Sequence, residues 1–123
     1  MPDIVPATAE MIDELHRAPL PRTSRVLAVI EDDEVLGVTG YYPQQGKLVL
    51  FAGVSDKARM EMNRHKRTLI KCARQIMDMA SEHGMPILAY ADPEITGSEV
   101  LLLHLGFHPI GQGVWEWLGQ ALQ

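Results

Sequence analysis

Residues 98–107 read Ser-Glu-Val-Leu-Leu-Leu-His-Leu-Gly-Phe, and this is the most specific pattern in the sequence. Thr96 and Glu99 have the spacing of a capping box, in which each side chain accepts a hydrogen bond from a backbone N–H at a helix start. The apolar run predicts a helix through Val100 to Leu105, and Gly106 suits the left-handed residue that ends a helix. A strand is expected directly after it.

The segments upstream of this helix predict a parallel pair of strands. Ile87 to Ala91 is a short apolar strand. Before it, apolar residues recur at helical spacing from about Arg64 to His83-Gly84, where Gly84 suits a left-handed cap. Lys47 to Val54 is almost continuously apolar, which is typical of a central strand covered on both faces. Because a helix connects the two strands, we expect them to be parallel neighbours.

The rest of the chain predicts antiparallel strands and one short helix. Residues 3 to 7 are extended, and Thr8 caps a helix over Ala9 to Arg17. The four acids of the turn Glu31 to Glu34 are expected to be solvated turn residues. The strands of the two predicted hairpins are Val26 to Ile30, Val35 to Tyr42, Phe107 to Ile110 and Val114 to Leu118. This order predicts an α/β (α+β) fold, in which flanking helices cover a mixed central sheet.

Length and composition limit the class of protein. The chain has 123 residues, 46% of them hydrophobic and 22% charged, which is typical of a single soluble domain over residues 1–123. No apolar run approaches the roughly 20 residues that cross a bilayer, so we expect no membrane contact. The single Cys72 excludes an internal disulfide, and the acidic N-terminal residues do not resemble a secretory signal. We therefore expect a reducing, cytoplasmic setting, with Cys72 as a small buried hydrophobe.

Basic residues are concentrated in residues 57–74. Seven of the eleven Lys and Arg residues lie there with one acid, so the segment carries a formal charge of +6 in a chain of net charge −5. These seven are Lys57, Arg59, Arg64, Lys66, Arg67, Lys71 and Arg74. This local excess predicts an anion site on an acidic body, and the alternative is a solvated helix face.

The order of elements resembles the GNAT (Gcn5-related N-acetyltransferase) superfamily over nearly the whole chain. Residues 98–107 look like the family's A-x-x-L-Y-x-x-L-G-F segment, where the last helix runs into the next strand. The start Ile4-Val5-Pro6-Ala7-Thr8 is similar to the family's I-R-P-A-T. The resemblance implies that the two parallel strands splay apart in a V, which opens a wedge for the pantetheine arm of CoA. The first helix and the hairpin are close in sequence, so the family's usual second helix is expected to be missing or reduced.

The resemblance also implies a site for acetyl-CoA or CoA, whose pyrophosphate would bind backbone N–H groups at the start of the long helix. The family's Q/R-x-x-G-x-G/A pattern aligns with residues 64–69, but Arg67 and Leu69 stand where the pattern has glycine. Glycine lets the backbone approach a phosphate closely, so the alignment predicts a degenerate CoA site. The alternative is a basic but empty helix start. The residues implied in cofactor binding are Val54, Arg64, His65, Lys66, Arg67 and Thr68.

Groups for proton transfer are few. In the family a tyrosine on the last helix protonates the departing thiolate, and Leu102 stands at that position. The catalytic candidates are Asp92 and Tyr90, at the end of the predicted parallel strand, and His104 on the last helix. The alternative for each is a loop acid or a structural side chain, so acetyl transfer is expected to be slow. Further candidates are Glu94, Tyr41 and Tyr42.

Two functions from different classes stay open. The first is a GNAT-fold protein related to acyl-CoA-dependent N-acetyltransferases, acting on an unknown amine acceptor. The second is a catalytically silent GNAT-like module that assembles with a protein partner. Such a module would be similar to the small GNAT-like proteins of T7-like tailed phages and would act in a virion or in host cytoplasm.

Other partners are weighed from single features. Trp115 and Trp117 share one face of the last strand, where they close the core or support a homo-oligomer. The acidic remainder of the chain disfavours nucleic acid as a partner. His104 and His108 have a metal-ligand spacing, but Gly106 interrupts the helix between them, so no metal is expected.

Overall fold

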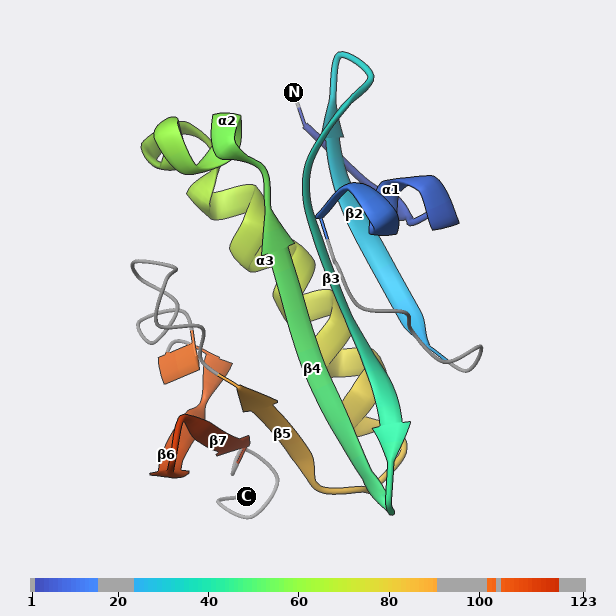
Figure 1. The fold of residues 1–123 in the computed structure, drawn as a ribbon, viewed down its shortest axis with the longest axis vertical. Coiled ribbons are helices and arrows are strands. Elements are labelled where there is room, and N and C mark those ends of the chain that lie inside the picture. Colours follow the sequence, from blue (N-terminus) through green and yellow to red (C-terminus); the bar gives the residue numbers. More distant parts are fainter. Residues whose placement is uncertain (1, 16–23, 91–101, 104, 118–123) are drawn as a thin grey trace.

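The computed structural model describes residues 2–15, 24–90, 102–103 and 105–117. Within these residues the strands form a seven-stranded sheet in the order β1-β2-β3-β4-β5-β7-β6 (Figure 1). The strands are β1 (Asp3–Pro6), β2 (Arg25–Glu31), β3 (Glu34–Gln44), β4 (Lys47–Val54), β5 (Ile87–Tyr90), β6 (Phe107–Gly111) and β7 (Val114–Trp117). The helices are α1 (Ala9–Leu15), α2 (Asp56–Met60) and α3 (Met62–Ser81). The predicted mixed sheet with flanking helices is confirmed.

Tight two-residue turns set the register of the antiparallel strands. Asp32 and Asp33, between β2 and β3, have φ of 52° and 66°, and Gln45 and Gly46, between β3 and β4, have φ of 50° and 78°. Positive φ at both central residues is what a type I′ turn requires, and the twist of this turn matches that of the two strands. The turn between β6 and β7 has the same feature. Each turn therefore determines which side chains face each side of the sheet.

β4 and β5 are the parallel pair, and they separate after a short contact. Residues 48–50 of β4 lie opposite residues 87–89 of β5. β4 continues to Val54, whereas the described part of β5 ends at Tyr90. Figure 1 shows the two strands diverging from their shared lower end. The expected parallel neighbours and their V-shaped splay are confirmed.

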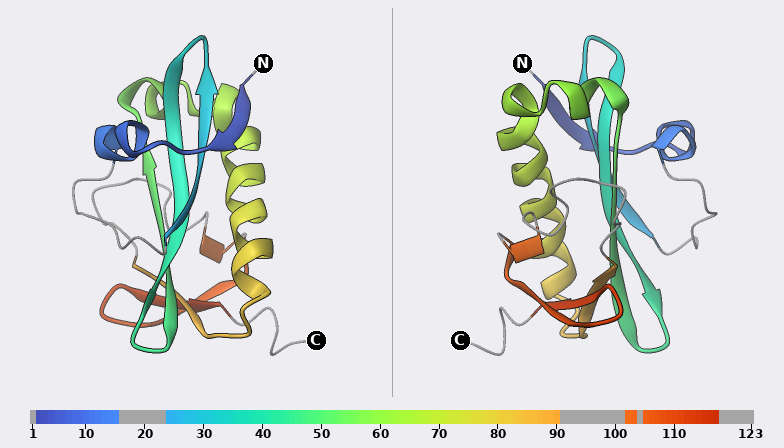
Figure 2. Two further views of the ribbon diagram at one scale, coloured as in Figure 1. Left: turned by 90° about the vertical axis from the view of Figure 1, so that its right-hand side faces the viewer. Right: turned by 60° about the vertical axis from the view of Figure 1, so that its left-hand side comes forward.

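α1 and α3 cover opposite faces of the sheet (Figure 2). α1 approaches β4 so closely that a Cβ atom on Gly53 would lie 2.6 Å from the carbonyl oxygen of Leu15. On the other face, α3 buries a stripe that includes Cys72, Ala73, Ile76, Met77 and Ala80. Glycine on β4 and small residues on α3 allow both helices to lie near the strands.

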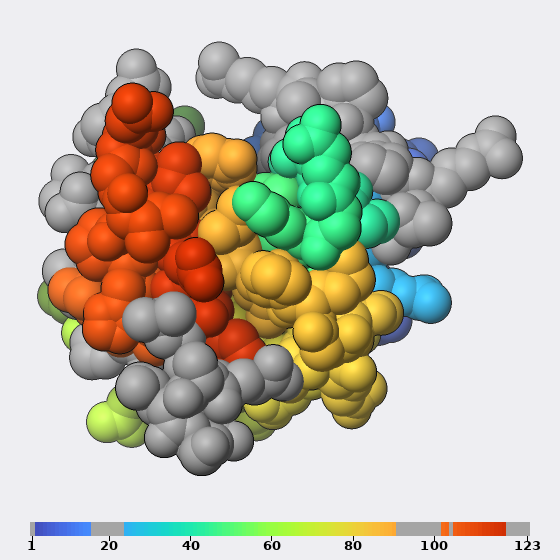
Figure 3. All heavy atoms as spheres, turned by 90° about the horizontal axis from the view of Figure 1, so that it is seen from below, coloured from blue at the N-terminus to red at the C-terminus, as the bar shows by residue number. Residues whose placement is uncertain are grey.

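The larger core cluster joins α3 to the C-terminal strands. Phe107 and Trp115 are buried in it, and Trp117 packs against it. The indole N–H of Trp117 donates to the carbonyl oxygen of Leu105 at 3.0 Å. Figure 3 shows the β6–β7 hairpin (red) beside the end of α3 and β5 (gold). Of the two interpretations of the tryptophans, this packing favours the core, because Trp115 offers little surface to a partner.

The connection between β4 and α3 differs from the prediction. The long helix begins at Met62, before the expected Arg64, and the short helix α2 precedes it. The Ser55 hydroxyl accepts from the N–H of Ala58 at 3.1 Å and so caps α2. Ser55 followed by Asp56 is a helix-start signal, and it explains a helix where a basic loop was expected.

Some expectations lie outside the described residues. The described part of α1 ends at Leu15, and the predicted end at Arg17 is not described. The same holds for the capping box of Thr96 and Glu99, although residues 102, 103 and 105 are helical. Gly106 has φ 95°, as the predicted helix end requires.

No helix in the described ranges has both the length and the apolar character to cross a membrane.

Candidate functional site

The wedge between β4 and β5 is the first candidate feature. In the described part of the chain, β5 reaches only as far as the Leu50–Ala89 pair, so residues 52–54 of β4 have no β5 residue opposite them. On its other side β4 pairs with β3 along its whole length. Within the described ranges, no strand pairs with the half of the β4 backbone that faces the wedge, so its donors and acceptors are candidates for contacts with a bound molecule.

The corner between α2 and α3 is the second candidate feature, and β4 leads directly into it through Ser55. The N–H of Glu61 donates to the carbonyl oxygen of Lys57 at 3.0 Å. The Glu61 carbonyl oxygen accepts from the N–H groups of Arg64 and His65 at 2.9 and 3.3 Å. Residues 62 and 63 therefore carry the first-turn N–H groups of α3 that lack an acceptor inside the helix. A surface hollow of about 380 Å³ lies over this corner and is lined by residues 60–64.

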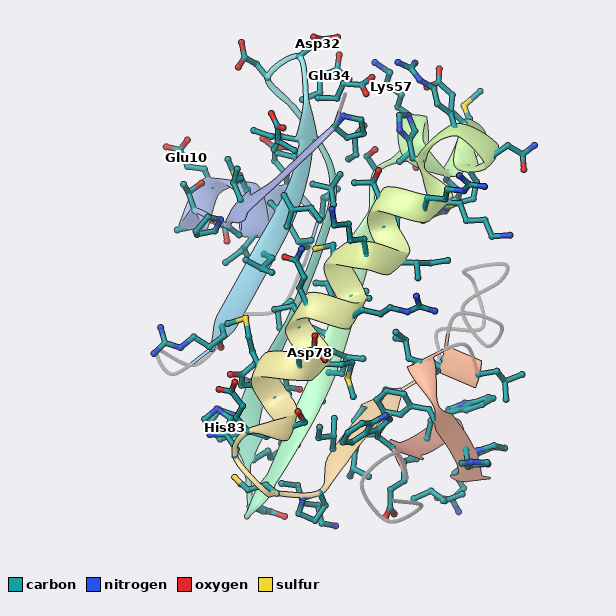
Figure 4. All side chains as sticks on the ribbon, turned by 180° about the vertical axis from the view of Figure 1, so that it is seen from behind. Glu10, Asp32, Glu34, Lys57, Asp78 and His83 are labelled. Atoms are coloured by element: carbon teal, nitrogen blue, oxygen red, sulfur yellow. The ribbon has the colours of Figure 1, made fainter. Side chains whose placement is uncertain are left out.

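Carboxylates already hold two cations at this corner. Arg64 Nη2 donates to Glu31 Oε1 at 2.8 Å, and Lys57 Nζ donates to Glu34 Oε2 at 3.1 Å. Figure 4 shows Glu34 and Lys57 side by side at the end of the molecule opposite His83. Glu61 Oε2 also lies 3.7 Å from Arg64 Nη1. Three carboxylates thus lie beside Lys57 and Arg64 and offset the charge of these two cations within the basic segment 57–74.

The expectation that the acids of this turn are solvated is wrong for Glu31, which is buried, whereas Glu34 is exposed as expected and also pairs with Lys57. The Glu31 side chain is only 8% exposed and is paired with Arg64, whose side chain is 62% exposed. The hydrogen bond from Lys57 to Glu34 raises the pKa of the lysine, since it favours the charged ammonium. The sequence contains a signal for this contact. A two-residue turn places Glu31 directly opposite Glu34, and like charges in that position need cations beside them.

The structure separates the residues that the sequence assigned to CoA. His65 is completely buried, so its ring does not reach this surface. Arg64 to Thr68 lie inside α3, so the helix start that they were expected to form is two residues upstream. Lys66 and Arg67 are exposed, and Thr68 is half-buried. Val54 is half-buried at the end of β4 and packs against the smaller core cluster.

The buried His65 is held from one side. Its Nε2 lies 3.2 Å from Glu61 Oε2, within hydrogen-bond distance. Its Nδ1 has no hydrogen-bond partner among the described residues. Leu69 is one of the two residues, with Arg67, that stand where the family pattern has glycine, and it is half-buried. It packs close to β3, because a Cβ atom on Gly37 would lie 2.8 Å from Leu69 Cδ2. Two residues of the aligned motif therefore contribute to packing.

Of the three catalytic candidates, only Tyr90 lies in the described residues. It is the last residue of β5, where the two strands separate, and it is 56% exposed. Asp92 and His104, with the further candidate Glu94, fall outside the described ranges. Leu102 is buried in the larger core cluster, so a side chain at this position packs against the protein interior.

The other tyrosines serve the fold. Tyr41 is buried in the larger core cluster, and its hydroxyl shares a hydrogen bond with His83 Nε2 at 3.1 Å. Burial raises the pKa of Tyr41, and Glu82 adds to this, while Arg25 acts in the opposite direction. Tyr42 packs its ring on Phe51, with the centroids 6.1 Å apart. A buried phenol with a raised pKa is a poor proton donor near neutral pH.

Cys72 is a buried thiol, as the sequence predicts. Burial raises the pKa of Cys72 to about 11, and the hydrogen bond with Thr39 only partly offsets this. The thiol is therefore protonated at neutral pH and unreactive. Among the described residues, no group of three His, Cys, Asp or Glu side chains is placed to hold a metal ion.

Solved structures share this architecture. An IAA acetyltransferase from Bacillus cereus has a TM-score of 0.67 at 12% identity, over 90% of this chain and 79% of its own. The ribosomal-protein-S18-alanine N-acetyltransferase from Escherichia coli has a TM-score of 0.66 at 10% identity, over 95% and 93%. A GNAT family acetyltransferase from Elizabethkingia anophelis, solved with acetyl-CoA bound, has a TM-score of 0.62 at 15% identity, over 89% and 78%. No protein-family model and no curated protein matches the sequence. Identities this low establish likeness of fold.

Proposed function

Because the chain has the fold of the GNAT acetyltransferases, we propose that it is related to N-acetyltransferases and binds acetyl-CoA or CoA weakly at a degenerate site. One observation carries the proposal. Among the described residues, the parallel pairing of β4 and β5 stops at Leu50 and Ala89, while β4 runs on to Val54. An extended chain such as pantetheine can then hydrogen-bond to the β4 backbone as a further strand would.

The helix start is a second point of support. A pyrophosphate beside residues 62 and 63 would meet backbone N–H groups and the positive end of the α3 dipole. Lys66 and Arg67, both exposed on α3, are cations within the same segment. Arg64 is less available, because its guanidinium already binds Glu31 and Glu61. The β4 backbone would favour the pantetheine arm, whereas the ion pairs of Arg64 leave fewer cations for the phosphates. We therefore propose weak binding.

Acetyl transfer on this scaffold is proposed to be slow. A bound thioester supplies an activated acyl group, and the chain must still accept a proton from the amine and donate one to the thiolate. Among the described residues at the wedge, Tyr90 alone carries a titratable hydroxyl, and Leu102 takes the position of the family's tyrosine. The rate would then come mostly from holding the thioester and the amine close together. A reducing, cytoplasmic setting belongs to this proposal and is supported by the free, buried Cys72.

A catalytically silent module is the second candidate. Two observations favour it. Leu102 is part of the core and cannot donate a proton, and carboxylates neutralise Lys57 and Arg64, which could otherwise bind phosphate. In that case the wedge would remain as an inherited feature without a ligand.

Calorimetric titration with CoA, combined with hydrogen exchange, tests the proposal. We expect weak binding, with the backbone amides of residues 52–54 and 62–63 gaining protection as CoA is added. The charge reversal Arg67→Glu should weaken binding, and so should added salt, because contacts to phosphate are screened. Glu10→Lys on α1, which covers the other face of the sheet, is the matched control and should leave affinity unchanged.

Two outcomes of these titrations would contradict the proposal. CoA that leaves both sets of amides unprotected at millimolar concentration would reject binding. Binding that is indifferent to salt and to Arg67→Glu would place CoA elsewhere on the molecule.

A further inference from the structure

We propose that Glu31 and Glu34, at the acidic end of the β2–β3 hairpin, are a built-in competitor for the anion that binds at the α2–α3 corner. This inference rests on the proposed function, because it describes how affinity at that same site is set. The two carboxylates bind Arg64 and Lys57 at 2.8 and 3.1 Å. They thereby take the positions at these cations that phosphate oxygens would take.

The geometry of the hairpin directs both carboxylates to one side. Glu31 and Glu34 form the last cross-strand pair before the turn, so their side chains share a face of the hairpin. Like charges in directly opposite positions repel each other unless a cation lies beside each one. Here α2 and α3 supply one cation to each carboxylate. The hairpin and the helical corner are therefore electrostatically complementary.

The two ion pairs differ in burial, and this difference determines which one a ligand opens. The Glu31 carboxylate is almost fully buried, and removing Arg64 would leave a buried charge without its partner. Lys57 and Glu34 have side chains that are 45% and 56% exposed, so solvent and ions exchange with this pair readily. An incoming phosphate is expected to recruit Lys57 from Glu34 while Arg64 stays on Glu31. Glu34 is then the residue that limits anion affinity.

Binding of inorganic pyrophosphate to the Glu34→Gln variant tests this inference. Glutamine keeps the size of the side chain and removes its charge, so Lys57 becomes available to the ligand. Asp33→Asn is the matched control, because it removes the same charge from the same hairpin. Asp33 has no ion-pair partner among the described residues, and asparagine tolerates its φ of 66°.

We expect Glu34→Gln to bind pyrophosphate about five-fold more tightly than the wild type. Asp33→Asn should change the affinity much less, because a charge in direct contact with Lys57 affects binding more than a screened charge farther away. The gain should disappear in Glu34→Gln combined with Lys57→Met. Equal affinities of Glu34→Gln and Asp33→Asn would overturn the inference. So would pyrophosphate that binds neither the wild type nor Glu34→Gln at millimolar concentration.

The same titrations with CoA separate this inference from the proposed function. If Glu34→Gln gains affinity for pyrophosphate and neither protein binds CoA, the inference that Glu34 competes with the anion is supported and the proposed CoA binding is rejected. If CoA binds the wild type and Glu34→Gln behaves as Asp33→Asn does, CoA binding stands and the competitor fails. Circular dichroism of each variant confirms that the fold is retained.

Discussion

Cys72 illustrates how burial changes the chemistry of a single residue. A lone cysteine in a sequence invites the idea of a nucleophile, yet this side chain lies in the apolar stripe of α3 and is almost completely buried. Its environment disfavours the thiolate, which is the reactive form. His65 is the polar counterpart, a buried ring with one nitrogen satisfied by Glu61. Neither side chain reaches the surface, so both contribute to the packing of the fold.

The raised pKa of Cys72 predicts a loss of stability in alkali. The thiol ionises near pH 9 in the unfolded chain and only near pH 11 in the folded one. Between these values the unfolded state releases a proton that the native state keeps, so the free energy of unfolding falls as pH rises, by about 3 kcal/mol at most. Below pH 9 this contribution is fully present. Urea unfolding at several pH values measures it.

The variant Cys72→Ala isolates this term from other groups that titrate in alkali, such as Tyr41, whose pKa is also raised. The variant should be less stable than the wild type at neutral pH and should lose less stability between pH 9 and 11. Identical slopes for the two proteins would show that Cys72 ionises as easily in the native state as in the unfolded one.

At the scale of elements, backbone approach governs how the strands and helices meet. Gly40 of β3 lies where a Cβ atom would be 2.3 Å from the carbonyl oxygen of Arg25 and 2.8 Å from Cζ of Phe51. Gly53 of β4 meets the end of α1 in the same manner. These glycines are required by packing, whereas Gly46 is required by its φ of 78° and has open space around it. Replacing a glycine that is required by close packing should therefore cost more stability than replacing one that is required only by its φ.

We expect Gly40→Ala to lower the free energy of unfolding by about 2–4 kcal/mol, because backbone atoms of a neighbouring strand must move. Gly46→Ala, the control, meets no atom and should cost only about 1 kcal/mol for its left-handed conformation. Chemical denaturation of the two variants measures both values. A loss at Gly40 no larger than the loss at Gly46 would contradict the packing argument.

At the scale of the whole molecule, few titratable groups lie at the wedge among the residues that the structure describes. Beyond the Leu50–Ala89 pair, residues 52–54 of β4 have no described β5 residue opposite them, and Tyr90, the last described residue of β5, is 56% exposed. Leu102, at the family's tyrosine position, is packed into the core with Phe107 and Trp115.

This arrangement predicts that Leu102→Tyr will not restore catalysis. The phenol would be forced among buried apolar side chains, which should cost about 1–3 kcal/mol of stability. Any acetyl transfer to a panel of amines should stay about 10²–10⁴ slower than with a general acid in place. Release of CoA thiol reports the rate, since the buried Cys72 does not react with thiol reagents in the native protein. A large gain in rate for Leu102→Tyr, or a large loss for Tyr90→Phe, would contradict this account.

The sequence by itself determined the order of the strands and of the long helix, because these depend on local spacing, but it did not reveal α2. Apolar residues at helical spacing place α3, and the helical crossover makes β4 and β5 parallel. α3 ends at Ser81, before the predicted His83-Gly84, and both Gly84 and Gly106 have positive φ. The site depended on contacts between residues far apart in the chain, which local patterns do not specify. The run of basic residues suggested an open anion site, and only the tertiary structure places Glu31 and Glu34 against Arg64 and Lys57. Charge acts through space over a few ångströms, so the sign of a surface is decided by its neighbours in the fold.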